Sequence, residues 1–249
     1  MKKINKEGRD KLFFVTNVFL LILFVSSVTG NQIILAKVSH KMGMKNMVMD
    51  KLSINFWSST NKNGIKLSGD LLEDTIKLVI SKGIPTAYGA ELNVNFDQAQ
   101  QSMDLMKQYD PTYGKNKIIL QGDDLQRYID VGLKISCEYC CSATSIINSS
   151  GAGACGCAHS QAMRGLMAYL IQYHGGEYTN DEILRELARW KGIYFPKQMI
   201  QKLSTQLQGS DFTPDTASLL IGLDLPDYGG GDVPLPSDIN NLPNMVGGC

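Results

Sequence analysis

The sequence has no excess of charge of either sign, because its 249 residues include 24 lysines and arginines and 24 aspartates and glutamates. No long block of basic or acidic residues interrupts this balance. Proteins that hold nucleic acid concentrate positive charge on one face or along one segment. We therefore expect no nucleic-acid partner and no charged interaction tail.

Catalytic motifs are also missing from the sequence. We find no hydrolase triad, no phosphate-binding loop and no pair of carboxylates placed for acid–base catalysis. Gly151 and Gly153 lack the third glycine and the strand-to-helix context of a dinucleotide-binding loop. The adjacent Asp123 and Asp124 are better explained as helix capping. We therefore predict no catalytic residue, and the sequence does not indicate an enzyme.

Long apolar runs are absent except near the N-terminus. Residues 12–28 carry no charge, and the eleven residues before them include five basic and two acidic side chains. This pattern is typical of a membrane anchor or of a signal peptide. A signal peptide would be cleaved after Gly30, whereas the length of the apolar run favours a retained anchor. By the positive-inside rule, we expect a single-pass protein of the cell membrane with an extracytoplasmic globular domain. Its partners would be the membrane and an unidentified membrane-associated protein.

The chain is expected to have four parts. These are a cytoplasmic flank with the anchor (1–35), a methionine-rich stalk (36–60), a globular domain with the cysteines (61–207) and a flexible tail rich in proline and glycine (208–249). Apolar residues in the globular domain recur mostly at helical spacing, and short apolar runs at Ile65–Leu67 and Ile118–Leu120 are typical of strands. The predicted fold class is α+β: a mostly helical domain with a few short strands, behind an N-terminal membrane anchor.

Capping residues and helix breakers delimit the expected helices. Ser68 or Asp70 begins one helix, and Asp97 begins a second that ends before Pro111. The clearest boundaries lie further along the chain: a helix from Ala158 to about His174, one that begins at a Thr179–Glu182 capping box and stops at Lys191–Gly192, and one from Pro196 to about Leu207.

The cysteines are unevenly placed, since five of the six fall within 21 consecutive positions. These are Cys137, Cys140, Cys141, Cys155 and Cys157, and His159 follows two residues later. Each close pair brings two thiolates to one side of a short turn, and the glycine- and serine-rich segment between the pairs can bend to bring them together. The last members precede a helix, whose N-terminal N–H groups stabilise a thiolate. We predict that these six residues form a metal site.

Two metals suit this ligand set. Zn²⁺ is bound by four cysteines or by three cysteines and a histidine, and Cu(I) is bound by two or three soft thiolates. An iron–sulfur cluster is less compatible, because the vicinal Cys140–Cys141 pair matches no ferredoxin pattern. The expected function is metal binding or delivery, or structural support. The alternatives are a thiol–disulfide oxidoreductase and a surface interaction module stabilised by disulfides.

Further soft ligands lie outside this cluster. Cys249 follows two glycines at the end of the chain and would join the metal site if the tail folds back. A methionine cluster in the stalk is a candidate secondary site for a soft metal such as Cu(I), and its alternative is an amphipathic helix beside the membrane. This cluster consists of Met42, Met44, Met47 and Met49.

The cysteine motif also resembles known sequences. The segments CEYCC, ACGCAHSQAMRGLMAYLI and EYTNDEILRELARWKGIYFPK are similar to a set of uncharacterised membrane-anchored proteins from archaea and uncultured bacterial lineages. This likeness runs from Cys137 to Lys197 and implies no activity, because that set has no established one. A more distant likeness links Cys155-Gly156-Cys157 to bacterial lipoproteins named for a Pro-Cys-Tyr-Cys-Gly-Cys motif, although the Pro-Cys-Tyr part is missing here.

Overall fold

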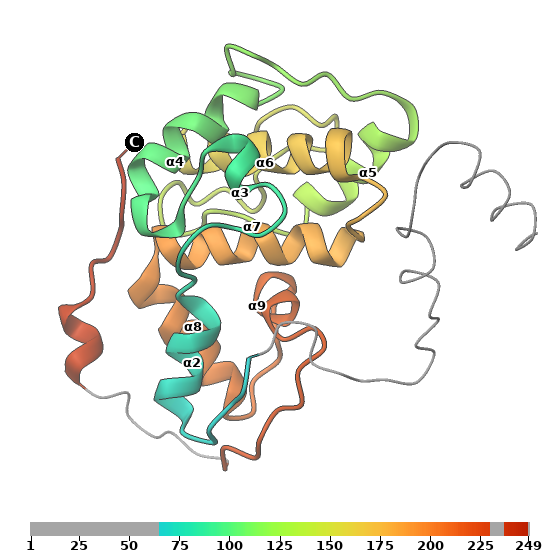
Figure 1. Cartoon of the computed structure of the whole chain (residues 1–249). Coiled ribbons are helices and arrows are strands. Elements are labelled where there is room, and N and C mark those ends of the chain that lie inside the picture. The colour runs from blue at the N-terminus through green and yellow to red at the C-terminus, as the bar shows by residue number, and fades with distance from the viewer. Residues whose placement is uncertain (1–64, 230–236, 249) are drawn as a thin grey trace, which may run out of the picture. The chain divides into compact units, whose positions relative to one another are not determined.

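Figure 1 shows the computed structural model of the chain, which describes residues 65–229 and 237–248. All of these residues belong to a compact unit that spans Thr60–Cys249. The predicted anchor and stalk lie outside the described residues. The α-helices are α2 (Leu71–Val79), α3 (Gly89–Leu92), α4 (Ala99–Met106), α5 (Gly122–Gly132), α6 (Ala158–His174), α7 (Asn180–Tyr194), α8 (Pro196–Leu207) and α9 (Pro214–Leu219), and the 3-10 helices are η1 (Phe96–Gln98), η2 (Lys107–Tyr109) and η3 (Ser237–Asn241).

The predicted α+β fold class is wrong, because the described residues form helices and no β-strand. An isolated antiparallel bridge joins Ile147 and Gly153. The segment around Ile118 does alternate between buried and exposed side chains, since Ile118 and Leu120 are buried and Ile119 is exposed. A strand also needs a neighbouring strand to pair with, and this segment packs its apolar side chains into a helical core instead.

No helix in the two described stretches is both long and apolar enough to cross a membrane. This finding contradicts the predicted localisation as a single-pass protein of the cell membrane with an extracytoplasmic domain. That prediction depended on residues 12–28, which lie outside the described residues.

Helix α6 forms the centre of the described unit. Its side chains from Ala162 to Ile171 are buried, with Tyr169 the half-buried exception, and the helix contacts α4, α5 and α7 (Figure 1). Gly165 allows a close approach to α4, because a Cβ atom at this position would lie 2.0 Å from the backbone oxygen of Met106. This packing fixes the position of the N-terminal end of α6, where the cysteine cluster lies.

Helix α7 lies beside α6 and leads directly into α8 (Figure 1). The capping box predicted at Thr179 and Glu182 is confirmed, because each side chain accepts a hydrogen bond from the backbone N–H of the other residue. The helix continues past its predicted end at Gly192, where a Cβ atom would lie 2.4 Å from a backbone oxygen of α2. This glycine serves close packing rather than helix termination, and the helix ends at Tyr194.

Candidate metal centre

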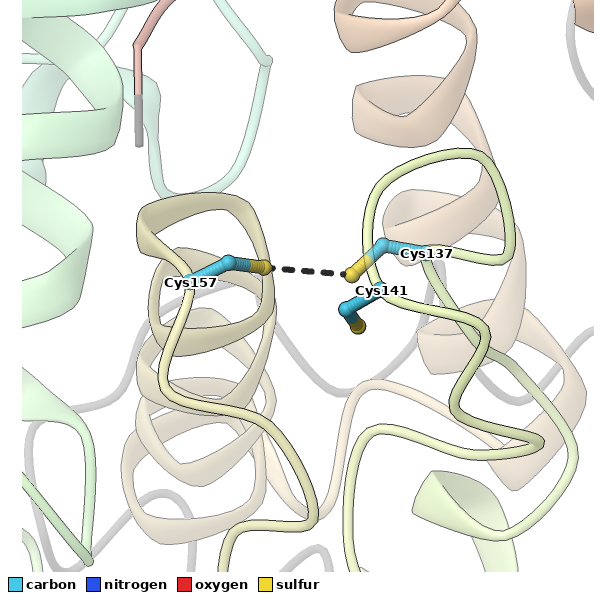
Figure 2. Close-up of side chains that lie close together, drawn as sticks. All are labelled: Cys137, Cys141 and Cys157. Atoms are coloured by element: carbon cyan, nitrogen blue, oxygen red, sulfur yellow. Dashed lines mark hydrogen bonds between the residues drawn. The ribbon is translucent and has the colours of Figure 1, made fainter.

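The cysteines come together where the turn at residues 137–141 faces the beginning of α6. The turn is closed by a hydrogen bond from the backbone N–H of Cys140 to the carbonyl of Cys137, at 2.9 Å. Figure 2 shows Cys137 and Cys141 on this turn, across from Cys157 at the N-terminal end of α6. The sulfur atoms of Cys137 and Cys157 are 3.4 Å apart. Two segments separated by the glycine-rich loop therefore converge, as the sequence predicted.

Five side chains form two overlapping groups that are close enough to hold a metal ion. The first group is Cys137, Cys141 and Cys157, and the second is Cys140, Cys157 and His159. Within each group, the candidate ligand atoms all lie within 4.8 Å of one another. Cys157 belongs to both groups and is therefore the candidate ligand that they share.

The position of Cys157 is set by helix capping. Its backbone is extended, and its sulfur accepts a hydrogen bond from the backbone N–H of Ser160 at 3.4 Å, which makes it the N-cap of α6. The unpaired N–H groups of a helix N-terminus favour negative charge at this position. The hydrogen bond with Cys137, followed by burial, nevertheless raises the pKa of the Cys157 thiol. A bound cation would therefore replace the proton that this thiol carries at neutral pH.

His159 is buried and held on two sides. Its ring packs against the rings of Tyr194 and Phe195, with centroids 4.8 and 5.0 Å away. Its Nε2 is 3.0 Å from the carbonyl oxygen of Val246. Because a carbonyl only accepts, Nε2 carries the proton and Nδ1 carries the lone pair of the neutral ring. Burial lowers the pKa of His159, although the bond to Val246 opposes this. A neutral imidazole with its second nitrogen bonded to a carbonyl is the usual state of a histidine that binds metal.

The C-terminal segment supplies this carbonyl by returning to the helical core (Figure 1). The backbone N–H of Val246 donates to the carbonyl of Tyr194 at 2.8 Å, and the N–H of Gly248 donates to the side chain of Gln100 at 2.9 Å. Gly247 between them has a φ of 80°, and a Cβ atom there would lie 2.9 Å from the methyl group of Met103. We call residues 246–248 the C-terminal strap.

Arg164 organises the loop that precedes α6. It is fully buried and forms a two-pronged ion pair with Asp110, at 2.9 and 2.7 Å. Its third nitrogen donates to the carbonyls of Ile146 and Cys155, both at 3.0 Å, and to the hydroxyl of Ser160 at 2.9 Å. One guanidinium group therefore holds the loop, the start of α6 and the end of the α4 region in one arrangement.

Cys155 lies outside both groups of candidate ligands in the described structure. Its sulfur accepts from the backbone N–H of Cys157 at 3.4 Å. Burial, and then a hydrogen bond with Cys155, raises the pKa of the Cys141 thiol to about 11. Burial acts to raise the pKa of Cys155 as well, but hydrogen bonds from Cys141 and from the Cys157 backbone lower it. Cys155 therefore supports the thiol network next to the centre.

Some of the predicted ligands lie within the described residues, and others lie outside them. Cys249 and the four methionines of the stalk lie outside the described residues, and their roles stay predictions. None of the five described cysteines is joined to another of them by a disulfide. Neither the carbonyl of Val246 as the partner of His159 nor Asp110 as the partner of Arg164 was predicted from the sequence. The residues that belong to the two groups are Cys137, Cys140, Cys141, Cys157 and His159.

Comparison with known proteins adds no functional information. No protein-family model matches the chain, and no curated protein or solved structure matches it. The resemblance suggested by the CEYCC and CGCAHS segments therefore stays a prediction.

Proposed function

We propose that this protein is a metal-binding protein that holds a soft ion, Cu(I) or Zn²⁺, through Cys157 and the side chains around it. The observation that carries the proposal is the position of Cys157, whose sulfur lies 3.4 Å from that of Cys137 and belongs to both groups of ligand atoms. Thiolate and imidazole are the ligands that Cu(I) and Zn²⁺ prefer, whereas hard ions such as Mg²⁺ prefer oxygen.

Reversible binding suits the structure better than a purely structural metal. Domains that need a metal to fold are usually too small to build a sufficient apolar core. Here α4, α6, α7 and α8 share one large core of buried apolar side chains. We therefore expect the described unit to stay folded without metal, so that the ion can be taken up and released.

A competition titration tests the proposal. Reduced, metal-free protein is titrated with Cu(I), and separately with Zn²⁺, in the presence of a chromophoric chelator of known affinity. We expect the protein to take one of these ions from the chelator and Cys157→Ala to abolish this ability. If the fully reduced protein takes up neither ion, the proposal is wrong.

One observation favours a second function, a thiol–disulfide oxidoreductase. The sulfur atoms of Cys137 and Cys157, which come from different segments, are 3.4 Å apart. Their oxidation to a disulfide would release two electrons and two protons to an acceptor disulfide, which would become two thiols. The two cysteines are 20 residues apart in the sequence. A thiol count that falls by two under a mild oxidant, in protein without metal, would favour this function over metal binding.

A further inference from the structure

The adjacent residues Cys140 and Cys141 belong to different groups of candidate ligands. This separation suggests that the centre holds more than one ion. Cys140 belongs to the group with His159, whereas Cys141 belongs to the group with Cys137. A single four-coordinate ion would need only one cysteine of the pair in addition to Cys137, Cys157 and the histidine. The doubled cysteine in CEYCC is explained if each member has its own ion.

We propose that the centre holds two soft metal ions bridged by the thiolate of Cys157. This inference depends on the proposed metal-binding function and specifies its stoichiometry. One ion would be bound by Cys137, Cys141 and Cys157, and the other by Cys140, Cys157 and His159. The geometry behind it is that the two groups of three ligand atoms share Cys157 and no other residue.

Both candidate metals can be bound by three protein ligands each. Cu(I) accepts two or three soft ligands, and Zn²⁺ with three protein ligands keeps one position open for water or a substrate. A thiolate sulfur has three lone pairs, so that it can bind two ions at once. Cys157 is suited to the bridging position, because it is the N-cap of α6 and accepts the N–H of Ser160.

Charge also favours a second ion. Four thiolates and a neutral histidine carry four negative charges, and charges in a partly buried site are costly unless they are compensated. The buried cation next to the loop, Arg164, is already paired with Asp110. A single Cu(I) would leave three negative charges if every thiol were ionised, whereas two Cu(I) ions leave two and two Zn²⁺ ions leave none. Each ion therefore makes ionisation of its own thiols less costly.

Native mass spectrometry of the full chain measures the stoichiometry directly. The reduced protein is loaded with excess Cu(I), and in a parallel sample with Zn²⁺, and weakly bound ions are removed by a chelator wash. We expect two ions per chain with at least one of the two metals. One ion would overturn the bridged arrangement and leave the proposed function standing, whereas no ion with all thiols reduced would overturn both.

Single substitutions then test the bridge. Cys137→Ala and His159→Asn each remove a ligand from one group, so each variant should retain one ion. Cys157→Ala removes a ligand from both groups and should retain none. A Cys157→Ala variant that still holds two ions would show two separate sites and would overturn the proposal.

A measurement on the unmodified protein avoids any effect of substitution on folding. Two ions that share one sulfur, each at about 2.3 Å from it, lie at most about 4.6 Å apart. X-ray absorption of the loaded protein should therefore detect a metal neighbour within this distance as well as a first shell of sulfur and nitrogen. Sulfur neighbours without a metal neighbour would contradict the bridge.

Discussion

The ring of His159 donates a hydrogen bond from Nε2 to the backbone carbonyl of Val246, which lies 87 residues further along the chain, at a distance of 3.0 Å. This bond fixes the ring tautomer and leaves the lone pair on Nδ1. The C-terminal strap thereby acts on the candidate centre without contributing a side chain to it. Outer partners of this kind orient the ligand and typically account for a 10- to 100-fold change in metal affinity.

The strap can be displaced by a single methyl group at Gly247. Its φ of 80° is strained for any other residue, and an added Cβ atom would lie 2.9 Å from the methyl group of Met103. We expect Gly247→Ala to weaken metal binding about 10-fold or more, because Val246 would lose its place beside His159. Competition titration measures the change.

Gly248→Ala is the matched control for this variant. A Cβ atom at Gly248 would meet no atom within 4 Å, so that affinity should stay within about twofold of the unmodified protein. Equal effects of the two substitutions would show that the strap does not orient His159. Cys249→Ser, tested in the same titration, measures separately whether the terminal thiol contributes.

Metal affinity should rise with pH. The hydrogen bond with Cys137 and burial raise the pKa of Cys157, and burial with a hydrogen bond to Cys155 raises the pKa of Cys141 to about 11. Both thiols therefore carry protons near neutral pH, and a metal ion has to displace them. Each displaced proton makes the apparent affinity about tenfold higher per pH unit.

Titrations at pH 6.5, 7.5 and 8.5 test this dependence. Burial lowers the pKa of His159, so the imidazole competes less for protons across this range than an exposed histidine would. His159→Asn should accordingly lower the affinity at every pH and leave the slope unchanged. An affinity that does not depend on pH would show that the thiols are already ionised or are not ligands.

The ion pair between Arg164 and Asp110 should be essential for stability. Both side chains are fully buried, and removing one partner leaves the other charge without compensation. We expect Asp110→Asn to lower the free energy of unfolding by about 3–5 kcal/mol. Chemical denaturation measures this loss. The exposed pair of Lys107 and Asp104 is the control, since Lys107→Met should cost less than about 1 kcal/mol. Equal losses would contradict the structural role of Arg164.

A second buried ion pair predicts sensitivity to acid. Burial would raise the pKa of Asp215, but Lys191 at 2.6 Å and Lys202 at 3.2 Å hold it at about 2, below its ordinary value of 3.8. Because the folded-state pKa is depressed, the stabilisation is complete above about pH 4 and is lost as the pH falls toward 2. The pKa difference corresponds to about 2 kcal/mol.

The variant Asp215→Asn isolates this contribution. Asparagine does not titrate, so the free energy of unfolding of the variant should fall less steeply between pH 5 and pH 2 than that of the unmodified protein. The difference in the free energy of unfolding between the two proteins should be about 2 kcal/mol smaller at pH 2 than at pH 5. Parallel curves would mean that Asp215 titrates alike in the folded and unfolded states.

Local sequence signals predicted the helices that border the centre. The bounds of α6 and α8 and the capping box of α7 are confirmed, because they depend on residues that are close in the sequence. The cysteine spacing likewise predicted that the turn at 137–141 meets the start of α6. Ile118–Leu120 was wrongly predicted as a strand, since an alternating pattern does not reveal whether a pairing partner exists.

Contacts between residues that are distant in the sequence could not be predicted from local sequence signals. Arg164 and Asp110 are 54 residues apart, and either one also fits an exposed helix surface when read alone. The contribution of Val246 comes from its backbone carbonyl, which every residue has. Helix α9 is a short helix in a segment rich in proline and glycine, and its packing against α7 is a tertiary contact. These features depend on how distant segments meet.

Elemental analysis of protein purified without added metal, combined with a count of free thiols before and after metal removal, tests the central claim most directly. We predict that copper or zinc is bound and that the cysteines of the two groups become reactive thiols once the ion is removed. Protein that contains no metal and in which Cys137 is joined to Cys157 by a disulfide would contradict the claim.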